Sequence, residues 1–152
     1  MDKRDDPANE VAKFVHRNRE IIRWGDMDAF GHVNNVQFFR YLEGARVAYS
    51  SEVAGSCLRA EGESVILADQ RCSFLRQLSW PGELDVYTRT VKVGRTSIHL
   101  AQLVCRAGEA EIVAAGAGVM VWFDFEAQRP AAVPEPLRRR VAEYERVCPE
   151  GL

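Results

Sequence analysis

The chain has few of the residues that mark a secreted, metal-binding or nucleic-acid-binding protein. Its four cysteines stand singly, with no C-x-x-C pair and no nearby histidine partner, at Cys57, Cys72, Cys105 and Cys148. This spacing favours reduced, mostly buried thiols over a zinc site or a disulfide framework. Twenty Lys and Arg residues stand against 22 Asp and Glu residues, a net charge of −2. Because both signs are spread along the chain, there is no electrostatic case for a nucleic-acid partner.

Long apolar runs are also missing. No segment has the length and hydrophobicity that spanning a bilayer requires. The N-terminus, residues 1–10, is charged and lacks the apolar stretch of a secretory signal. We therefore expect a soluble, cytoplasmic protein without a membrane partner.

What the chain does contain is enough apolar material for one core. Of its 152 residues, 47% are hydrophobic, and a chain of this length buries roughly 70% of the surface that its unfolded form exposes. We expect one domain at residues 13–130, preceded by a flexible tail at residues 1–12. A C-terminal helical tail, residues 131–152, should pack on that domain.

The clearest helical pattern follows residue 34. Asn34 or Asn35 can cap a helix, and Gly55 can end it. Between them, apolar residues recur at steps of three and four, and further apolar positions extend over most of the circumference. Such a helix must be wrapped by the rest of the chain. These apolar positions are Phe38, Phe39, Tyr41, Leu42, Ala45, Val47, Ala48, Tyr49 and Val53.

The rest of the chain has the pattern of strands. One strand ends at Gly25, before the helix, and four longer ones are expected after it, at residues 64–78, 84–93, 96–106 and 110–125. Short turns at residues 80–83 and 107–109 predict that consecutive strands pair as antiparallel hairpins. Small residues at positions 114–118 suit a close approach of the helix to the sheet.

These elements predict an α+β fold, in which a long central helix is wrapped by a curved antiparallel five-stranded sheet and a short helix follows at the C-terminus. The edges of such a sheet are left open. Pairing between chains is the common way to cover them, so we expect at least a homodimer.

The loop between the first strand and the helix carries two acids, Asp26 and Asp28. A carboxylate beside a helix N-terminus is stabilised in its ionised form, and the N–H groups there can polarise a carbonyl oxygen. Asp28, with N–H donors from roughly His32 to Asn35, would suit attack on an ester or thioester carbonyl.

The residues alone leave other roles open for this loop. Both aspartates can be turn residues that bond to their own backbone, which is the favoured interpretation for Asp26. His32 can be structural. An Asp/Asp/His metal site would lack a further ligand, so we expect no metal and no cofactor.

The run W-G-D-M-D-A-F-G-H-V-N-N at residues 24–35, followed by F-x-Y-x-E-x-A-R at residues 39–46, closely resembles the signature of hotdog-fold acyl-CoA thioesterases of the 4-hydroxybenzoyl-CoA thioesterase type. The resemblance implies that Asp28 acts as nucleophile or general base on an acyl-CoA. It also implies that the amide of Asn35 polarises the thioester carbonyl. Some relatives have a histidine at that position, and their histidine-assisted mechanism is not available here.

The resemblance further implies a homodimer with composite sites, in which the aspartate of one chain faces strands of the other. Pairing of dimers into tetramers stays open. Substrate contacts are expected from the loop and from residues near strand ends, where coenzyme A phosphates can dock; the candidates are Gly31, His32, Val33, Asn34, Arg71, Arg95, Thr96 and Ser97. Arg76 is another cation near a strand end. For every one of these cations, a solvated surface charge is the default interpretation.

The motif does not include the residues expected to contact the two ends of the substrate, the adenosine and the acyl group. Residues 138–140, all arginines, could contact the adenosine end, with a solvated helix face as the default. For the acyl pocket we expect helix residues and the turn that follows the second strand, namely Phe38, Phe39, Leu42, and Ser79 or Trp80.

Three functions remain compatible with these residues. Hydrolysis of an acyl-CoA is the leading one. A non-catalytic acyl-thioester binder would use Asp28 only to cap a turn. A dehydratase acting on acyl-carrier-protein thioesters would pair His32 with Asp28. The acyl group and its carrier stay open.

Overall fold

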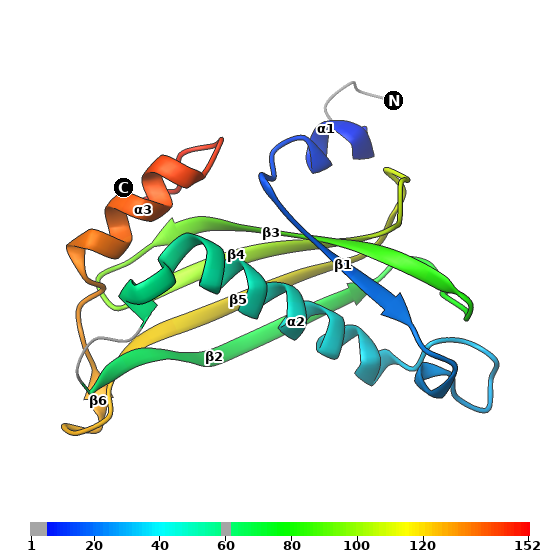
Figure 1. Cartoon of the computed structure of the whole chain (residues 1–152), viewed down its shortest axis with the longest axis horizontal. Helices are drawn as coiled ribbons and strands as arrows, with labels where there is room; N and C mark the ends of the chain where they lie inside the picture. Colours follow the sequence, from blue (N-terminus) through cyan, green and yellow to red (C-terminus); the bar gives the residue numbers. More distant parts are fainter. Residues whose placement is uncertain (1–5, 59–61) are drawn as a thin grey trace.

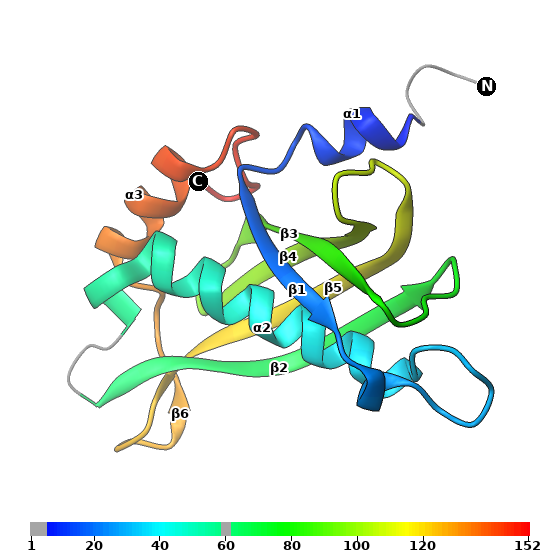
Figure 2. The ribbon, with the colours of Figure 1, turned by 45° about the vertical axis from the view of Figure 1, so that its right-hand side comes forward.

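The computed structural model describes residues 6–58 and 62–152. It has the predicted α+β architecture: the long helix α2 lies against a curled antiparallel sheet, and the short helix α3 follows the last strands (Figures 1 and 2). The elements are α1 (Pro7–Val11), β1 (His16–Ile22), α2 (Asn35–Ala54), β2 (Glu63–Phe74), β3 (Gly82–Val93), β4 (Ser97–Arg106), β5 (Ile112–Asp124), β6 (Arg129–Pro130) and α3 (Glu135–Tyr144).

Helix α2 begins and ends where the sequence predicts. The Asn34 side chain accepts a hydrogen bond from the Val36 N–H at 2.9 Å, which caps the helix. Gly55 follows the last helical residue with φ of 51°, a conformation that suits glycine. The face that packs on the sheet is buried, but Val47 on another face is 59% exposed, so the sheet of one chain does not wrap the whole helix.

Gly116 of β5 lies directly against the side chain of Leu42 on the helix. A Cβ atom at this position would lie 2.9 Å from Cδ1 of Leu42, which is fully buried. The predicted close approach at the run of small residues is therefore confirmed, because only glycine leaves room for the leucine.

The predicted hairpin at residues 80–83 is wrong. The strand order is β1-β3-β4-β5-β2, with β6 paired to β5, so β2 lies at the sheet edge next to β5 and not beside β3. The segment between β2 and β3 instead passes the site loop, where the Leu78 carbonyl accepts a hydrogen bond from Val33 N–H at 2.8 Å. That contact is with a residue 45 positions earlier, and no local pattern signals it. The hairpins β3–β4 and β4–β5 do form, the latter across residues 107–109.

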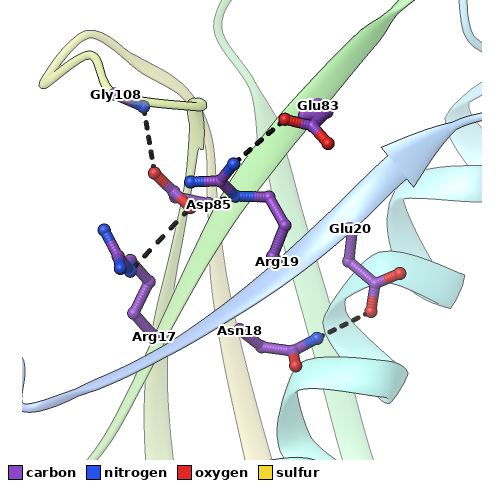
Figure 3. Close-up of polar contacts among 7 residues, drawn as sticks. All are labelled: Arg17, Asn18, Arg19, Glu20, Glu83, Asp85 and Gly108. Carbon is purple, nitrogen blue, oxygen red and sulfur yellow. Dashed lines mark hydrogen bonds and ion pairs between the residues drawn. The ribbon is translucent and has the colours of Figure 1, made fainter.

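Strand β1 is an edge strand of the sheet, and its side chains contact β3 on one face and the helix α2 on the other (Figure 3). The Asp85 carboxylate, 1% exposed, accepts from Arg19 Nε at 2.8 Å and from Gly108 N–H at 3.0 Å. On the other face, the Glu20 carboxylate lies against Gly44 of α2, where a Cβ atom would collide with it. β1 is thereby fixed to both layers, and so is the start of the loop that follows it.

Figure 1 shows α3 beside the end of α2, with α1 placed well apart from it. Part of the predicted N-terminal tail forms α1, and residues 1–5 lie outside the described part. At the C-terminal side, Leu137 and Val141 of α3 pack in one apolar cluster with Tyr49 and Val53 of α2. No helix in the described part of the chain has the length and apolar character needed to cross a bilayer.

Candidate active site

The loop after β1 is closed by its own backbone hydrogen bonds. The Asp28 N–H donates to the His32 carbonyl, the Gly31 N–H donates to the Asp28 carbonyl, both at 3.0 Å, and the Asn34 N–H donates to the Asp26 carbonyl at 2.9 Å. Gly31 has φ of 79°, so the turn needs a residue that tolerates a left-handed backbone. The result is a compact loop that ends directly at the cap of α2.

Asp28 is both a turn residue and a cavity residue. One carboxylate oxygen accepts from the Phe30 N–H at 2.9 Å, which is an Asx-turn, and the other accepts from Asn34 Nδ2 at 3.3 Å. The side chain is half-buried and lines a cavity of about 440 Å³. Within the described residues it forms no ion pair, so its charge is free to act on a ligand.

The cavity brings most of the predicted loop residues together. Its lining consists of Asp28, Phe30, His32, Val33, Asn34, Asn35, Phe38, Phe74, Leu75, Arg76, Gln77 and Leu78. Gly31 is not part of the lining and instead accepts a hydrogen bond from Ser79 Oγ at 3.3 Å through its carbonyl. Both catalytic candidates, Asp28 and Asn35, thus face one cavity.

Two of the four predicted N–H donors are already occupied. Val33 N–H bonds to Leu78, and Asn34 N–H bonds to Asp26. The N–H groups of His32 and Asn35 have no hydrogen-bond partner in the described part of the chain. Asn35 is the first residue of α2, where the N–H groups are unpaired and the helix dipole is positive. It is therefore the best placed donor for an oxygen that gains negative charge.

The opposite wall comes from the end of β2 and the segment after it, and of its residues the sequence reasoning singles out only Arg76. Phe74 stacks edge-on against Phe38, with ring centroids 5.2 Å apart, and Arg76 carries the only guanidinium or ammonium group among the described lining residues. No local pattern could have found this wall, because it depends on the long-range contact between Val33 and Leu78.

The residues predicted for the acyl pocket do not all line this cavity. Phe38 lines the cavity, whereas Leu42 is fully buried beneath Gly116 and takes no part in it. Phe39 contacts Phe74 from outside the lining, and Ser79 and Trp80 lie just beyond it in the chain.

Within one chain, four predicted substrate contacts lie away from this cavity. Arg71 is exposed on the edge strand β2 and pairs with Asp69 at 3.3 Å. Arg95, Thr96 and Ser97 occupy the β3–β4 turn, which is separated from the loop by the length of β3, roughly 35 Å at about 3.3 Å per residue. Their turn is covered by the C-terminal segment, since the Val133 N–H donates to the Arg95 carbonyl at 2.9 Å. Within one chain, these residues do not line the cavity at Asp28.

Two of the three arginines of α3 form hydrogen bonds that stabilise the fold. Arg138 donates to the carbonyl oxygens of Gly94 and Val133, and Arg140 donates to the Ala54 carbonyl at the end of α2, at 2.7 Å. Both side chains satisfy backbone acceptors at the ends of elements, and only Arg139 remains for the predicted adenosine contact.

Asp26 does more than the turn role that the sequence favours. One of its oxygens accepts from the Arg23 N–H at 2.8 Å, as a turn residue would, and also from the Tyr41 hydroxyl at 2.6 Å. Asp26 and Tyr41 are both buried, at 7% and 2% exposed. The pairing with α2 was not predicted, because Tyr41 falls on an apolar helix face that indicates plain core.

Comparison with known proteins identifies the family. A family model described as the thioesterase-like superfamily matches residues 22–141, which include the loop, α2 and the main strands. The chain belongs to the thioesterase-like superfamily. This membership confirms the expectation of an enzyme of the thioester hydrolase class, and the loop and cavity lie inside the matched region.

Relatives of this thioesterase-like chain include YsmA of Bacillus subtilis (strain 168), 36% identical over 71% of this chain and 72% of that protein. The chloroplastic acyl-acyl carrier protein thioesterase ATL3 of Arabidopsis thaliana is 22% identical over 81% of this chain. The chain spans 65% of that protein's length.

Two solved structures are similar to this chain. A thioesterase from Thermus thermophilus, complexed with coenzyme A and Zn, is 37% identical with a TM-score of 0.73, covering 84% of this chain and 98% of that chain. The PA5185 protein from Pseudomonas aeruginosa strain PAO1 is 25% identical with a TM-score of 0.78, covering 88% of this chain and 94% of that chain.

Proposed function

We propose that this protein hydrolyses an acyl-CoA to the free acid and coenzyme A. The observation that carries the proposal is the juxtaposition of the Asp28 carboxylate with the unpaired Asn35 N–H on one cavity in the described part of the chain. The thioester carbonyl would bind with its oxygen on that N–H group. Asp28 would then attack the carbonyl carbon or take a proton from an attacking water.

The magnitudes agree with an enzyme that uses both groups. A positioned acid or base contributes about 10²–10⁴ in rate, and one oxyanion donor contributes about 10²–10³. Asp28 is well suited to the first role, because its two hydrogen bonds hold the carboxylate in one orientation while it lines the cavity.

The choice of coenzyme A as carrier is supported by the Thermus thermophilus relative, which is complexed with it. Arg76, 63% exposed at the cavity, offers a cation for a phosphate, although it now pairs weakly with Glu111 at 3.4 Å. The relation to the 4-hydroxybenzoyl-CoA thioesterase type within the superfamily belongs to this proposal, as does the cytoplasmic location.

An acyl-carrier-protein thioester is the second candidate substrate, since ATL3 is a thioesterase for that carrier. The same carboxylate and N–H would act on the same bond, so the two candidates differ only outside the cavity. Membership of the thioesterase-like superfamily favours hydrolysis over the non-hydrolytic binder and the dehydratase. For the dehydratase, His32 is available at the cavity beside Asp28.

We further propose that the active form is a homodimer with composite sites. Strand β2 lies at one edge of the sheet, and it carries Leu67, 44% exposed, and Phe74, 42% exposed. Val47 of α2 and Leu67 border one groove of about 660 Å³ beside this edge. A second copy on β2 would cover this apolar surface, and it is the route by which Arg71, Arg95, Thr96 and Ser97 could serve a neighbouring site.

The test is thiol release from a panel of acyl-CoA and acyl-carrier-protein thioesters by the wild type and by Asp28→Asn. We expect release from acyl-CoA by the wild type, and a loss of at least about 10²-fold in the variant because the carboxylate is the base or nucleophile. An unchanged melting temperature of Asp28→Asn would show that folding is intact.

The other outcomes separate the alternatives. Tight binding of acyl-CoA without thiol release would favour the binder. Loss of water from a 3-hydroxyacyl thioester would favour the dehydratase. Release from carrier-protein thioesters alone would move the proposal to the second carrier.

A further inference from the structure

Asp28 is held by a chain of contacts that starts on helix α2 at Tyr41. The Tyr41 hydroxyl donates to Asp26 Oδ2, the Asp26 carbonyl accepts from the Asn34 N–H, and the Asn34 side chain donates to Asp28 Oδ2. The distances are 2.6, 2.9 and 3.3 Å. Each link joins the helix to the loop, or one side of the loop to the other.

The first link fixes the Asp26 end of the loop to the helix. Asp26 is 7% exposed and carries a carboxylate that must be hydrogen-bonded to be tolerated there. It has two donors, the Tyr41 hydroxyl and the Arg23 N–H. Burial, reinforced by the Asp26 carboxylate, raises the pKa of Tyr41, so the hydroxyl stays a donor at any working pH.

The ring of Tyr41 also bears on the cavity. It packs edge-on against Phe38, with ring centroids 6.1 Å apart, and Phe38 is part of the cavity lining. Tyr41 itself is not among the described lining residues, so it cannot contact a ligand there. Any effect on the reaction must pass through its neighbours.

We propose that Tyr41 and Asp26 form a positioning pair that sets the Asp28 carboxylate relative to the Asn35 N–H. This inference rests on the proposed thioester hydrolysis. Without the Tyr41 hydroxyl, the Asp26 end of the loop loses the side-chain bond that ties it to α2, while the Asn35 N–H stays with the helix. The Asp28 carboxylate and the Asn35 N–H would then no longer keep their relative positions. A shift of even a fraction of an ångström lowers the rate of a positioned reaction.

The chain supplies a matched control on the same helix. Tyr49 is also 2% exposed, and its hydroxyl donates to a buried carboxylate, Glu145, at 2.5 Å. It lies at the other half of α2, next to α3, and its hydrogen bonds and ring contacts within the described residues do not involve the loop. Tyr49→Phe therefore removes the same kind of bond from the same helix without touching the chain of contacts to Asp28.

The experiment compares Tyr41→Phe and Tyr49→Phe in steady-state hydrolysis and thermal unfolding, with the wild type and Asp28→Asn alongside. Both tyrosine variants should melt below the wild type by similar amounts. Tyr41→Phe should lower kcat by about tenfold with KM nearly unchanged, because the loss lies in alignment rather than in binding. Tyr49→Phe should keep the wild-type kcat.

A double-variant cycle tests the route of the effect. If Tyr41 acts through Asp26, then Tyr41→Phe combined with Asp26→Ala should lose no more kcat than Asp26→Ala alone. Asp26→Asn keeps an acceptor for both donors and should restore most of the activity that Asp26→Ala loses.

The outcomes are distinguishable from those of the proposed function. A wild type that hydrolyses no thioester overturns both proposals. A wild type that is active and sensitive to Asp28→Asn, with equal kcat values for Tyr41→Phe and Tyr49→Phe, overturns the positioning role alone. Fully additive losses in kcat in the double-variant cycle would also overturn it.

Discussion

Asn34 has two duties that a single substitution can separate. Its Oδ1 accepts from the Val36 N–H and caps α2, and its Nδ2 donates to Asp28 Oδ2. The first duty belongs to the stability of the helix and the second to the orientation of the acid. Only the first could be predicted from the sequence, because asparagine before a helical pattern predicts a cap, whereas the bond to Asp28 depends on how the loop closes.

Replacing Asn34 by serine should separate these duties. A serine hydroxyl still caps the helix, so we expect the free energy of unfolding to stay within about 0.5 kcal/mol of the wild type. The donor to Asp28 is lost, so kcat should fall severalfold. Asn34→Ala should lose kcat similarly and also about 1 kcal/mol of stability, the usual cost of an absent cap. Urea unfolding and steady-state kinetics measure the two effects; equal stability of both variants would contradict the capping role.

At the scale of elements, the sequence predicts the helix well and the strand partners less well. The apolar repeat, the asparagine cap and Gly55 are local signals, and they place both ends of α2 correctly. The partner of β2 is not a local property, because its residues pair with residues of β5 that lie 40 to 61 positions later in the chain. The short connection after β2 suggested a hairpin, and that prediction failed because this segment is used to build the cavity wall.

The contact between α2 and β5 gives a prediction at this scale. Gly116→Ala would place a Cβ atom 2.9 Å from Leu42 Cδ1 and 3.1 Å from Cδ2. Both layers are fixed there, so we expect the free energy of unfolding to fall by about 1–3 kcal/mol, the usual cost of overpacking. Denaturant unfolding measures it.

A second substitution checks the cause of that loss. Leu42→Val removes one carbon from the leucine and should recover part of the stability in the Gly116→Ala background. Gly118→Ala is the control in the same strand, because its Cβ atom would meet the flexible end of Gln70 at 3.0 Å and should cost less. Equal losses at the two glycines would contradict the tight contact with Leu42.

At the scale of the whole molecule, one chain brings the proposed catalytic groups together but not every predicted substrate contact. The loop, the helix start and the described cavity lining come together within one chain. The β3–β4 turn lies at the opposite end of the sheet, so the predicted contacts there do not share the cavity of Asp28 and Asn35 within one chain. The proposed homodimer would resolve this difference.

The dimer prediction can be checked by changing one sheet edge at a time. Leu67→Glu puts a charge on exposed β2 and should convert the dimer to a monomer in light scattering, with reduced hydrolysis if the sites are composite. Ile21→Glu is the matched control on the opposite edge strand β1, where the side chain is 55% exposed. It should leave the mass unchanged. A wild-type monomer, or a dimer that both variants leave intact, would contradict pairing through β2.

The two hydrogen bonds of the Asp28 side chain have a consequence for how such a protein can change during evolution. One is a turn contact with the Phe30 N–H and the other is a long bond to the side-chain amide of Asn34, so the stability of the fold depends little on the Asp28 side chain. Descendants could exchange the acid for another residue and inherit the scaffold undamaged. A protein with this fold can therefore lose the acid, and hydrolysis with it, while keeping its structure. A similar fold does not by itself show that a related protein is an active enzyme.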